Sequence, residues 1–120
     1  QRYRLLGYPF AALYEEGVPI ALSTDAPVER VDPWENIRSA LRFFPIQEVF
    51  HMYTYRSAQS GFDEERTGNL RKGGYADALL FDKDPFALNQ SELEKIRPVN
   101  VLFNGKWLFD TDTAYGGGLM

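Results

Sequence analysis

Apolar positions in the first half of the chain predict a helix, a short strand and a second helix, in that order. Residues 9–16 suit a short helix that begins at a proline, and Gly17 follows where helices commonly end in a left-handed conformation. Residues 18–23 form an apolar run, which is typical of a strand buried on both faces. This succession is the rhythm of a βα unit in a parallel sheet.

The helix after this strand has the clearest start signal. Asp32 can cap it, Pro33 suits its first position, and Glu35 stands where the carboxylate of a capping box reaches back. Its apolar stripe consists of Trp34, Ile37, Leu41 and Phe44. A further helix is expected over residues 46–60, with Gly61 as its stop.

The second half of the chain is richer in strands. Residues 63–75 are polar and interrupted by glycines, which places a boundary between two parts of the chain near residues 61–67. A helical turn is expected at residues 91–96, and the dipeptide Asn104-Gly105 between two apolar runs is a strong hairpin signal. The strand candidates are residues 76–82, 99–103 and 107–109.

Composition narrows the class of protein. The 120 residues include 13 Lys and Arg against 17 Asp and Glu, a formal net charge of -4, and the basic residues form no sustained block. We therefore expect no nucleic-acid partner. No apolar run reaches the ~18 residues of a membrane span, and cysteine is absent, so we expect a soluble, cytoplasmic protein without membrane contact or disulfides.

Asp25 is the residue whose position points to chemistry. A carboxylate at the carboxyl end of a buried parallel strand stands where α/β barrels and open sheets place ligand-binding groups. The alternative is a turn carboxylate that accepts hydrogen bonds from nearby backbone N–H groups before Pro27. Position alone leaves both interpretations open.

Several separate motifs, in the same order, resemble the family-three branch of the amidohydrolases. Residues 24–28 (TDAPV) stand where that branch has Ser-Asp-Ala-Pro-Val, and Asp32-Pro33 follows as the start of its next helix. Two features depart from the pattern: Gly74 replaces a common Lys, and the insertion that often walls the substrate pocket is very short here. Further matching positions are Gly17, Val18, Tyr53, Thr54, Ala58, Gly61, Glu65, Gly68, Leu70, Gly73, Ala76, Asp77, Asp82, Asp84, Pro85, Val101, Asn104, Gly105 and Lys106.

This resemblance implies an α/β fold in two parts. Residues 1–62 would hold the last strand and helices of a TIM-like (β/α)8 metal-dependent hydrolase barrel, as its C-terminal βα fragment. Residues 63–110 would be the C-terminal strands of a small β-rich domain, which N-terminal strands complete in the family, and residues 111–120 a flexible tail. Because the chain begins at Gln1 rather than Met, we expect a processed or truncated product.

The resemblance also implies a reaction. Asp25 would coordinate a divalent metal, expected to be zinc, and take a proton from the water that attacks a carbon–nitrogen bond in an amide, cyclic amide or N-acyl substrate. Thr24, Ala26, Pro27 and Val28 would shape the loop at the mouth of the site. The other metal ligands would come from earlier strands, usually as a His-x-His pair with further histidines. Since this chain has 1 histidine, we expect no metal at its catalytic site and no activity in the chain alone.

Other candidate residues lead to weaker hypotheses. His51 lies away from the apolar stripe of its expected helix, which indicates a surface histidine rather than a metal ligand. Residues 82–84 lack the rest of a calcium loop and are typical of a turn that ends a strand. Ser23, Ser57 and Ser60 have no matching base, which argues against a nucleophilic triad.

A hypothesis from a different class stays open: a non-enzymatic α/β module for self-association or partner binding. Whether the reading frame upstream of Gln1 encodes a His-x-His strand distinguishes the two. In either case we expect the isolated chain to self-associate, because unpaired strand edges and exposed apolar area invite partner chains. The apolar residues that would lack strand neighbours are Ile20, Leu22, Leu79, Leu80 and Phe81.

Overall fold

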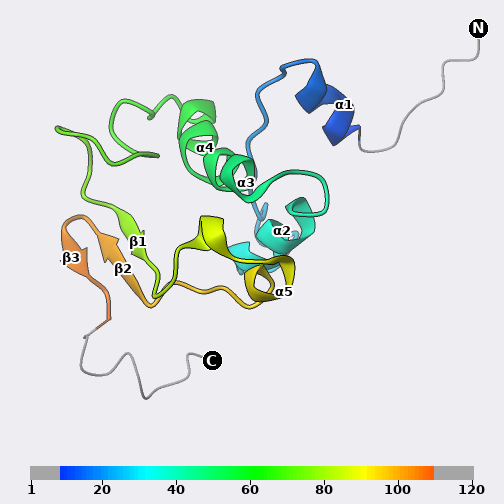
Figure 1. Cartoon of the computed structure of the whole chain (residues 1–120). Coiled ribbons are helices and arrows are strands. Elements are labelled where there is room, and N and C mark those ends of the chain that lie inside the picture. The colour runs from blue at the N-terminus through cyan, green and yellow to red at the C-terminus, as the bar shows by residue number, and fades with distance from the viewer. Residues whose placement is uncertain (1–8, 110–120) are drawn as a thin grey trace, which may run out of the picture.

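A computed structural model describes residues 9–109, in which helices lie together and a small sheet lies beside them (Figure 1). The predicted tail at residues 111–120, with Asp110 and residues 1–8, lies outside the described range. The helices are α1 (Phe10–Glu15), α2 (Pro33–Ala40), α3 (Ile46–Tyr53), α4 (Tyr55–Ser60), the 3₁₀ helix η1 (Pro85–Ala87) and α5 (Gln90–Leu93). The strands are β1 (Ala78–Leu80), β2 (Asn100–Phe103) and β3 (Lys106–Trp107), so an α/β chain with a three-stranded sheet is confirmed.

Asp32 and Pro33 start α2 as the sequence predicts, whereas the capping box expected at Glu35 does not form. Asp32 Oδ1 accepts a hydrogen bond from the Trp34 backbone N–H at 2.9 Å. The carboxylate of Glu35, which the sequence places for a capping box, makes an ion pair with Arg30 at 3.4 Å. Arg97 Nη2 lies 3.3 Å from Asp32 Oδ2, and its guanidinium lies 5.5 Å from the centre of the Trp34 ring. Asp32 therefore caps α2 and also ties it to the segment after α5.

The single helix predicted over residues 46–60 is divided into α3 and α4, so that prediction is wrong at one residue. Thr54 between them has φ -112° and ψ -86°, outside the helical region. Its Oγ1 donates a hydrogen bond to the Phe50 carbonyl at 2.7 Å, the same oxygen that accepts from the Thr54 backbone N–H. A hydroxyl that bonds four residues back is a known cause of helix bending.

None of the helices within residues 9–109 combines the length and the apolar character that crossing a bilayer requires.

Residues 18–23, predicted as a strand buried on both faces, pair with none of the described strands. Ile20 and Leu22 are half-buried against the helical core, whereas Ala21 and Ser23 are exposed. This alternation is that of an extended segment with one covered face. A ladder needs a neighbouring strand, and the described residues place none beside this segment. Burial on both faces is therefore wrong for the face that carries Ala21 and Ser23.

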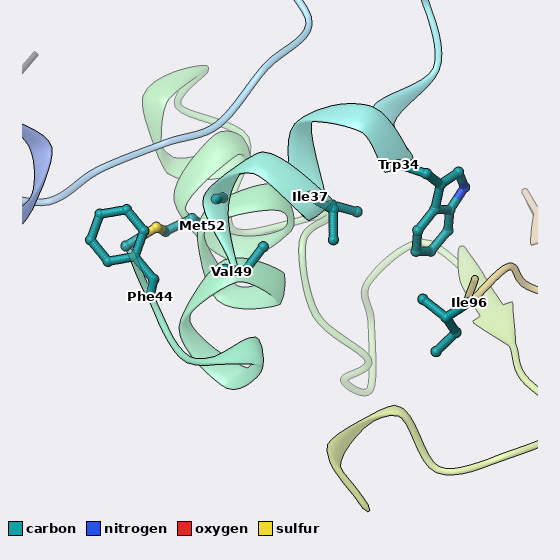
Figure 2. Packing of buried hydrophobic residues seen from close by; sticks show 7 residues of the cluster. Trp34, Ile37, Phe44, Val49, Met52 and Ile96 are labelled. Carbon is teal, nitrogen blue, oxygen red and sulfur yellow. The ribbon is translucent and has the colours of Figure 1, made fainter. Parts of the chain in front are cut away.

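One apolar cluster forms the core, and Figure 2 shows Phe44 and Met52 toward one end and Trp34 and Ile96 toward the other. Ile96 follows α5, so residues from both sides of the boundary predicted near residues 61–67 share this core. That boundary stays a prediction. The buried members are Trp34, Ile37, Ala40, Phe44, Val49, Met52 and Ile96.

Aromatic rings extend this core toward the sheet. Phe81, directly after β1, lies with its ring centre 6.0 Å from Trp34 and 6.1 Å from Phe50. Trp34 and Phe50 meet edge to face at 6.5 Å. Such geometries are favourable beyond the apolar area that they bury. The three rings therefore join α2, α3 and the end of β1.

The hairpin predicted at Asn104-Gly105 is confirmed. These residues have φ 49° and 75°, and positive φ at both central positions is what a type I′ turn requires. On either side, Phe103 pairs with Lys106. The sheet order is β1-β2-β3 with antiparallel pairing throughout, so β1 is an edge strand among the described residues.

Asn100 closes the open end of this hairpin, a role that the sequence did not reveal. It is buried, with 2% of its surface exposed. Its Oδ1 accepts hydrogen bonds from the N–H groups of Val101 and Phe109 at 2.8 and 3.2 Å, and its Nδ2 donates to the Phe109 carbonyl at 3.0 Å. A buried amide with its acceptor and a donor both bonded carries little penalty for leaving water.

The cap at Asp32 can be tested by substitution. Asp32→Ala should lower the free energy of unfolding by about 1 kcal/mol, because the Trp34 N–H loses its acceptor. Asp32→Asn is the matched control, since it keeps an oxygen acceptor at the cap and should retain most of that stability. Reversible urea unfolding of both variants measures the difference. If the Ala variant is as stable as the unchanged chain, α2 does not depend on this cap.

Gly68 and Gly73 form a matched pair for a second test, since both have positive φ, 86° and 89°. A Cβ on Gly68 would lie 2.8 Å from Ala58 Cβ and 2.9 Å from Tyr55 Cα, whereas nothing lies within 4 Å of one on Gly73. We predict that Gly68→Ala lowers the free energy of unfolding by about 2 kcal/mol more than Gly73→Ala does. Gly73→Ala should lose mainly the roughly 1 kcal/mol that an alanine in the left-handed conformation costs. Urea unfolding of both variants measures this difference, and equal losses would show that residues 67–70 move freely away from α4.

Candidate functional site

Asp25 lies in a tight turn after the extended segment and is exposed. Its φ of 51° is uncommon for a residue other than glycine. The Asp25 backbone N–H donates to Ser23 Oγ at 3.1 Å, and its carbonyl accepts from the Val28 N–H at 2.9 Å. The turn is therefore closed by backbone groups and a serine hydroxyl. Within residues 9–109 the Asp25 carboxylate makes no hydrogen bond or ion pair, so its side chain is left to solvent.

The segment that leads to Asp25 is held by the helices. The Leu22 N–H donates to the Met52 carbonyl at 3.2 Å, and Ser57 Oγ donates to the Leu22 carbonyl at 2.9 Å. One residue further on, Asn36 Nδ2 donates to the Ser23 carbonyl at 2.8 Å. Side chains of α2 and α4 and a carbonyl of α3 therefore hold the backbone two and three residues before Asp25.

The other predicted residues of the loop divide into two kinds. Thr24 is half-buried and lines a hollow beside the turn, while Ala26, Pro27 and Val28 are exposed. The Ala26–Pro27 peptide bond is cis. The hollow is lined by Ala21, Leu22, Ser23, Thr24, Val31, Pro33, Tyr53, Ser57 and Ser60. Thr24 is the member of the predicted loop that the structure brings to this hollow.

The residues present do not by themselves fit a metal centre. In the described part of the chain, no three His, Cys, Asp or Glu side chains gather where they could hold a metal ion. His51 is exposed and stacks on the Tyr55 ring with ring centres 5.3 Å apart, so its prediction as a surface histidine is confirmed. Asp25 is thus a single carboxylate, and no step through a metal follows from these residues.

Two acidic residues of the second half, Asp63 and Asp84, have structural partners. Asp84 Oδ1 accepts a hydrogen bond from the Phe86 N–H at 2.9 Å and caps η1, which confirms the turn predicted to end a strand. Arg66 Nε lies 2.8 Å from Asp63 Oδ1, and the Asp63 carboxylate, followed by Tyr75, raises the pKa of Arg66 above its ordinary value. These contacts hold loops in place.

Asn36 and Ser57 are the residues near the site that sequence reasoning missed. The sequence marks Ser57 only as a candidate nucleophile and gives Asn36 no candidate role. The available signal was weak: Asn36 is a polar residue beside Ile37 at the edge of an apolar stripe. Their contacts with the extended segment span 13 and 35 positions of sequence, which no local pattern encodes.

A broader apolar hollow lies between the α3–α4 pair and the sheet. It receives rings from Phe50 and Phe81 and aliphatic side chains from the edge strand and the preceding loop, and it contains none of residues 24–28. The apolar residues that line it are Phe50, Tyr53, Ala58, Leu70, Ala78, Leu79, Phe81, Phe86, Val101, Leu102 and Phe103. It is therefore separate from the turn that carries Asp25.

Comparison with known proteins identifies the group to which these features belong. A curated relative from Bacillus subtilis (strain 168), named "Putative amidohydrolase YtcJ", is 26% identical over 119 residues. That match covers 86% of this chain and 22% of the relative, so the chain spans about a fifth of the length of the curated relative. The family model described as Amidohydrolase family matches residues 1–109. Since that match takes in most of the sequence, the chain belongs to the amidohydrolase family, whose fold is a TIM barrel.

Proposed function

We propose that this chain is the C-terminal part of a metal-dependent hydrolase that cleaves carbon–nitrogen bonds in amides, cyclic amides or N-acyl compounds. The observation that carries the proposal is the exposed Asp25 carboxylate, which has no protein partner among residues 9–109 and stands at the end of an extended segment with one open face. Membership of the amidohydrolase family and the short match to a much longer relative support it.

The extended segment has the two faces that a barrel strand needs. Strands of a TIM barrel turn one face to the outer helices and the other to the barrel interior. Here Ile20 and Leu22 pack on the helical core, while Ala21 and Ser23 form the open face. We propose that this segment is the last strand of the barrel, with its ladder partners supplied by the rest of a full-length parent. Asp25 would then lie at the carboxyl end, where TIM-barrel enzymes place catalytic groups.

In this proposal Asp25 is the general base. Its carboxylate accepts a proton from the attacking water and passes it to the leaving nitrogen, and Thr24, Ala26, Pro27 and Val28 form the loop that borders the substrate. Amidohydrolases generally use a divalent metal, which we propose to be zinc in the full-length parent. The remaining ligands would come from earlier strands, because residues 9–109 bring no group of ligands together.

The proposal predicts opposite behaviour for the chain and for the parent. The 120-residue chain should hydrolyse no amide with added zinc or manganese, because one carboxylate holds a divalent ion weakly. In the parent, Asp25→Asn should lower kcat by roughly a hundredfold or more. The amide keeps the size of the carboxylate but cannot accept the proton. Turnover of N-acyl amino acids and cyclic amides measures both effects.

Asp82→Asn is the matched control for this substitution. Asp82 is exposed and lies outside the turn that carries Asp25, so this variant should keep the activity of the unchanged parent. Circular dichroism should show the same fold for both variants. Metal-dependent turnover by the purified chain would contradict the assignment, and so would a fully active Asp25→Asn parent.

A second candidate function, self-association, is favoured by the edge strand β1. Leu79 and Leu80 are 49% and 46% exposed, and the apolar hollow lies beside them. An exposed edge with apolar side chains offers unpaired N–H and C=O groups to another chain. We propose that the isolated chain associates through this edge, whether or not the parent is an enzyme.

A charged residue introduced on the edge strand β1 should suppress this association. Sedimentation velocity should show dimers or larger species of the chain at micromolar concentration, and Leu79→Lys should shift them toward monomer because a charge on an edge strand opposes pairing. Phe62→Lys is the control, since Phe62 is 92% exposed but lies outside the sheet. A compact monomer of the unchanged chain at all concentrations would rule out the proposal.

A further inference from the structure

We propose that Asn36 and Ser57 are positioning residues, whose side chains fix the turn that presents the Asp25 carboxylate. The inference rests on the proposed function, since it gives a catalytic purpose to contacts that the structure contains. Neither side chain reaches Asp25. Both act on the backbone of the two residues, Leu22 and Ser23, that lead into the turn.

Ser57 lies at a junction of three elements. Its Oγ is 2.9 Å from the Leu22 carbonyl and 2.9 Å from the Met52 carbonyl. The one hydroxyl proton of Ser57 is shared between these two carbonyls. The Leu22 N–H donates to the same Met52 carbonyl at 3.2 Å, so both backbone groups of Leu22 lie within hydrogen-bond distance of a partner. Met52 belongs to the last turn of α3, where carbonyls lack partners within a helix. The break between α3 and α4 thus provides the acceptor and the hydroxyl that hold the extended segment.

Asn36 holds the next residue from the other side. Its Nδ2 donates to the Ser23 carbonyl at 2.8 Å and lies 3.3 Å from the Tyr53 hydroxyl, and an amide nitrogen has two N–H groups for these two partners. Ser23 Oγ in turn accepts from the Asp25 N–H at 3.1 Å. A continuous path of hydrogen bonds therefore runs from α2 through Ser23 to the backbone of Asp25.

These hydrogen bonds fix the orientation of the extended segment as well as its distance from the helical core. Apolar contacts of Ile20 and Leu22 hold the segment against the core, but the hydrophobic effect is not directional. Hydrogen bonds are directional, and no ladder orients this segment among the described residues. The orientation of the turn is thus set by the side chains of Asn36 and Ser57 together with the bond from the Leu22 N–H to the Met52 carbonyl. A displacement of about 1 Å in a catalytic group can cost on the order of a hundredfold in rate.

The first test uses the 120-residue chain and needs no enzymatic activity. The backbone N–H groups of Asp25 and Val28 both donate within the turn, so their hydrogen exchange, followed by NMR, reports on its order. Asn36→Ala and Ser57→Ala should each speed this exchange about fivefold, the size expected for one lost hydrogen bond. All chains are compared at the same concentration, so that association affects each equally.

Two serines provide matched controls. Ser39 Oγ donates to the Glu35 carbonyl within α2, and Ser60 Oγ donates to the Ser57 carbonyl within α4. Ser39→Ala and Ser60→Ala remove a hydroxyl from the same helices without removing a bond to the extended segment. In both variants the rate of hydrogen exchange at the Asp25 backbone N–H should stay within about twofold of the rate in the unchanged chain.

The second test uses the full-length parent. Asn36→Ala and Ser57→Ala should lower kcat by roughly tenfold or more with KM little changed, because a misplaced base weakens the transition state more than substrate binding. Ser57→Thr keeps the hydroxyl and should restore most of kcat. A role in stability alone would lower the melting temperature and the amount of folded enzyme, and would leave kcat per folded molecule unchanged.

The two tests separate this inference from the proposed function. Unchanged exchange at Asp25 and Val28 in both Ala variants overturns positioning, whatever the hydrolysis assays show. Unchanged kcat in both variants of an active parent also overturns it. Faster exchange in the chain, combined with a parent that hydrolyses no carbon–nitrogen bond, supports the hold of Asn36 and Ser57 on the turn and rejects the proposed function.

Discussion

The arrangement of the candidate site depends on how an apolar extended segment satisfies its backbone without a strand beside it. Backbone N–H and C=O groups that leave water need partners, and a sheet normally supplies them. In residues 9–109 no strand pairs with this segment, and Met52, Ser57 and Asn36 engage the groups of Leu22 and Ser23. The helices thereby take the place of a sheet on one side. The other face remains open, and Asp25 follows directly at its end.

The helix α2, which helps to hold the extended segment, also joins the two halves of the chain. The helix that carries Asn36 is fixed at its start by Asp32, which pairs with Arg97 from the second half. Trp34 on that helix packs against Phe81, directly after the edge strand. The small sheet and the turn of the candidate site are therefore coupled through α2. We propose that in a full-length parent this coupling connects the β-rich part to the catalytic end of the barrel.

Features that depend on neighbours in sequence were determined by the sequence itself. Asp32 caps α2 because its carboxylate needs to reach an N–H only two residues away. Asn104 and Gly105 form a hairpin turn because both tolerate positive φ, and Gly17, with φ 76°, ends α1 for the same reason. The surface position of His51 followed from helical periodicity. The order of separate motifs also indicated the amidohydrolase family, which the family match confirms. The role of Asp25 stays a prediction.

Features that depend on distant residues were decided by the tertiary structure. The sequence could not show that none of the strands within residues 9–109 lies beside residues 18–23, because apolar residues look alike whether a neighbour is present or not. Nor could it show that Asn36 and Ser57 hold this segment, since these contacts join positions 13 and 35 apart. The break at Thr54 was missed because both helical flanks favour continuation. In each case the decisive partner is a backbone group, which exists at every position and leaves no signature in the sequence.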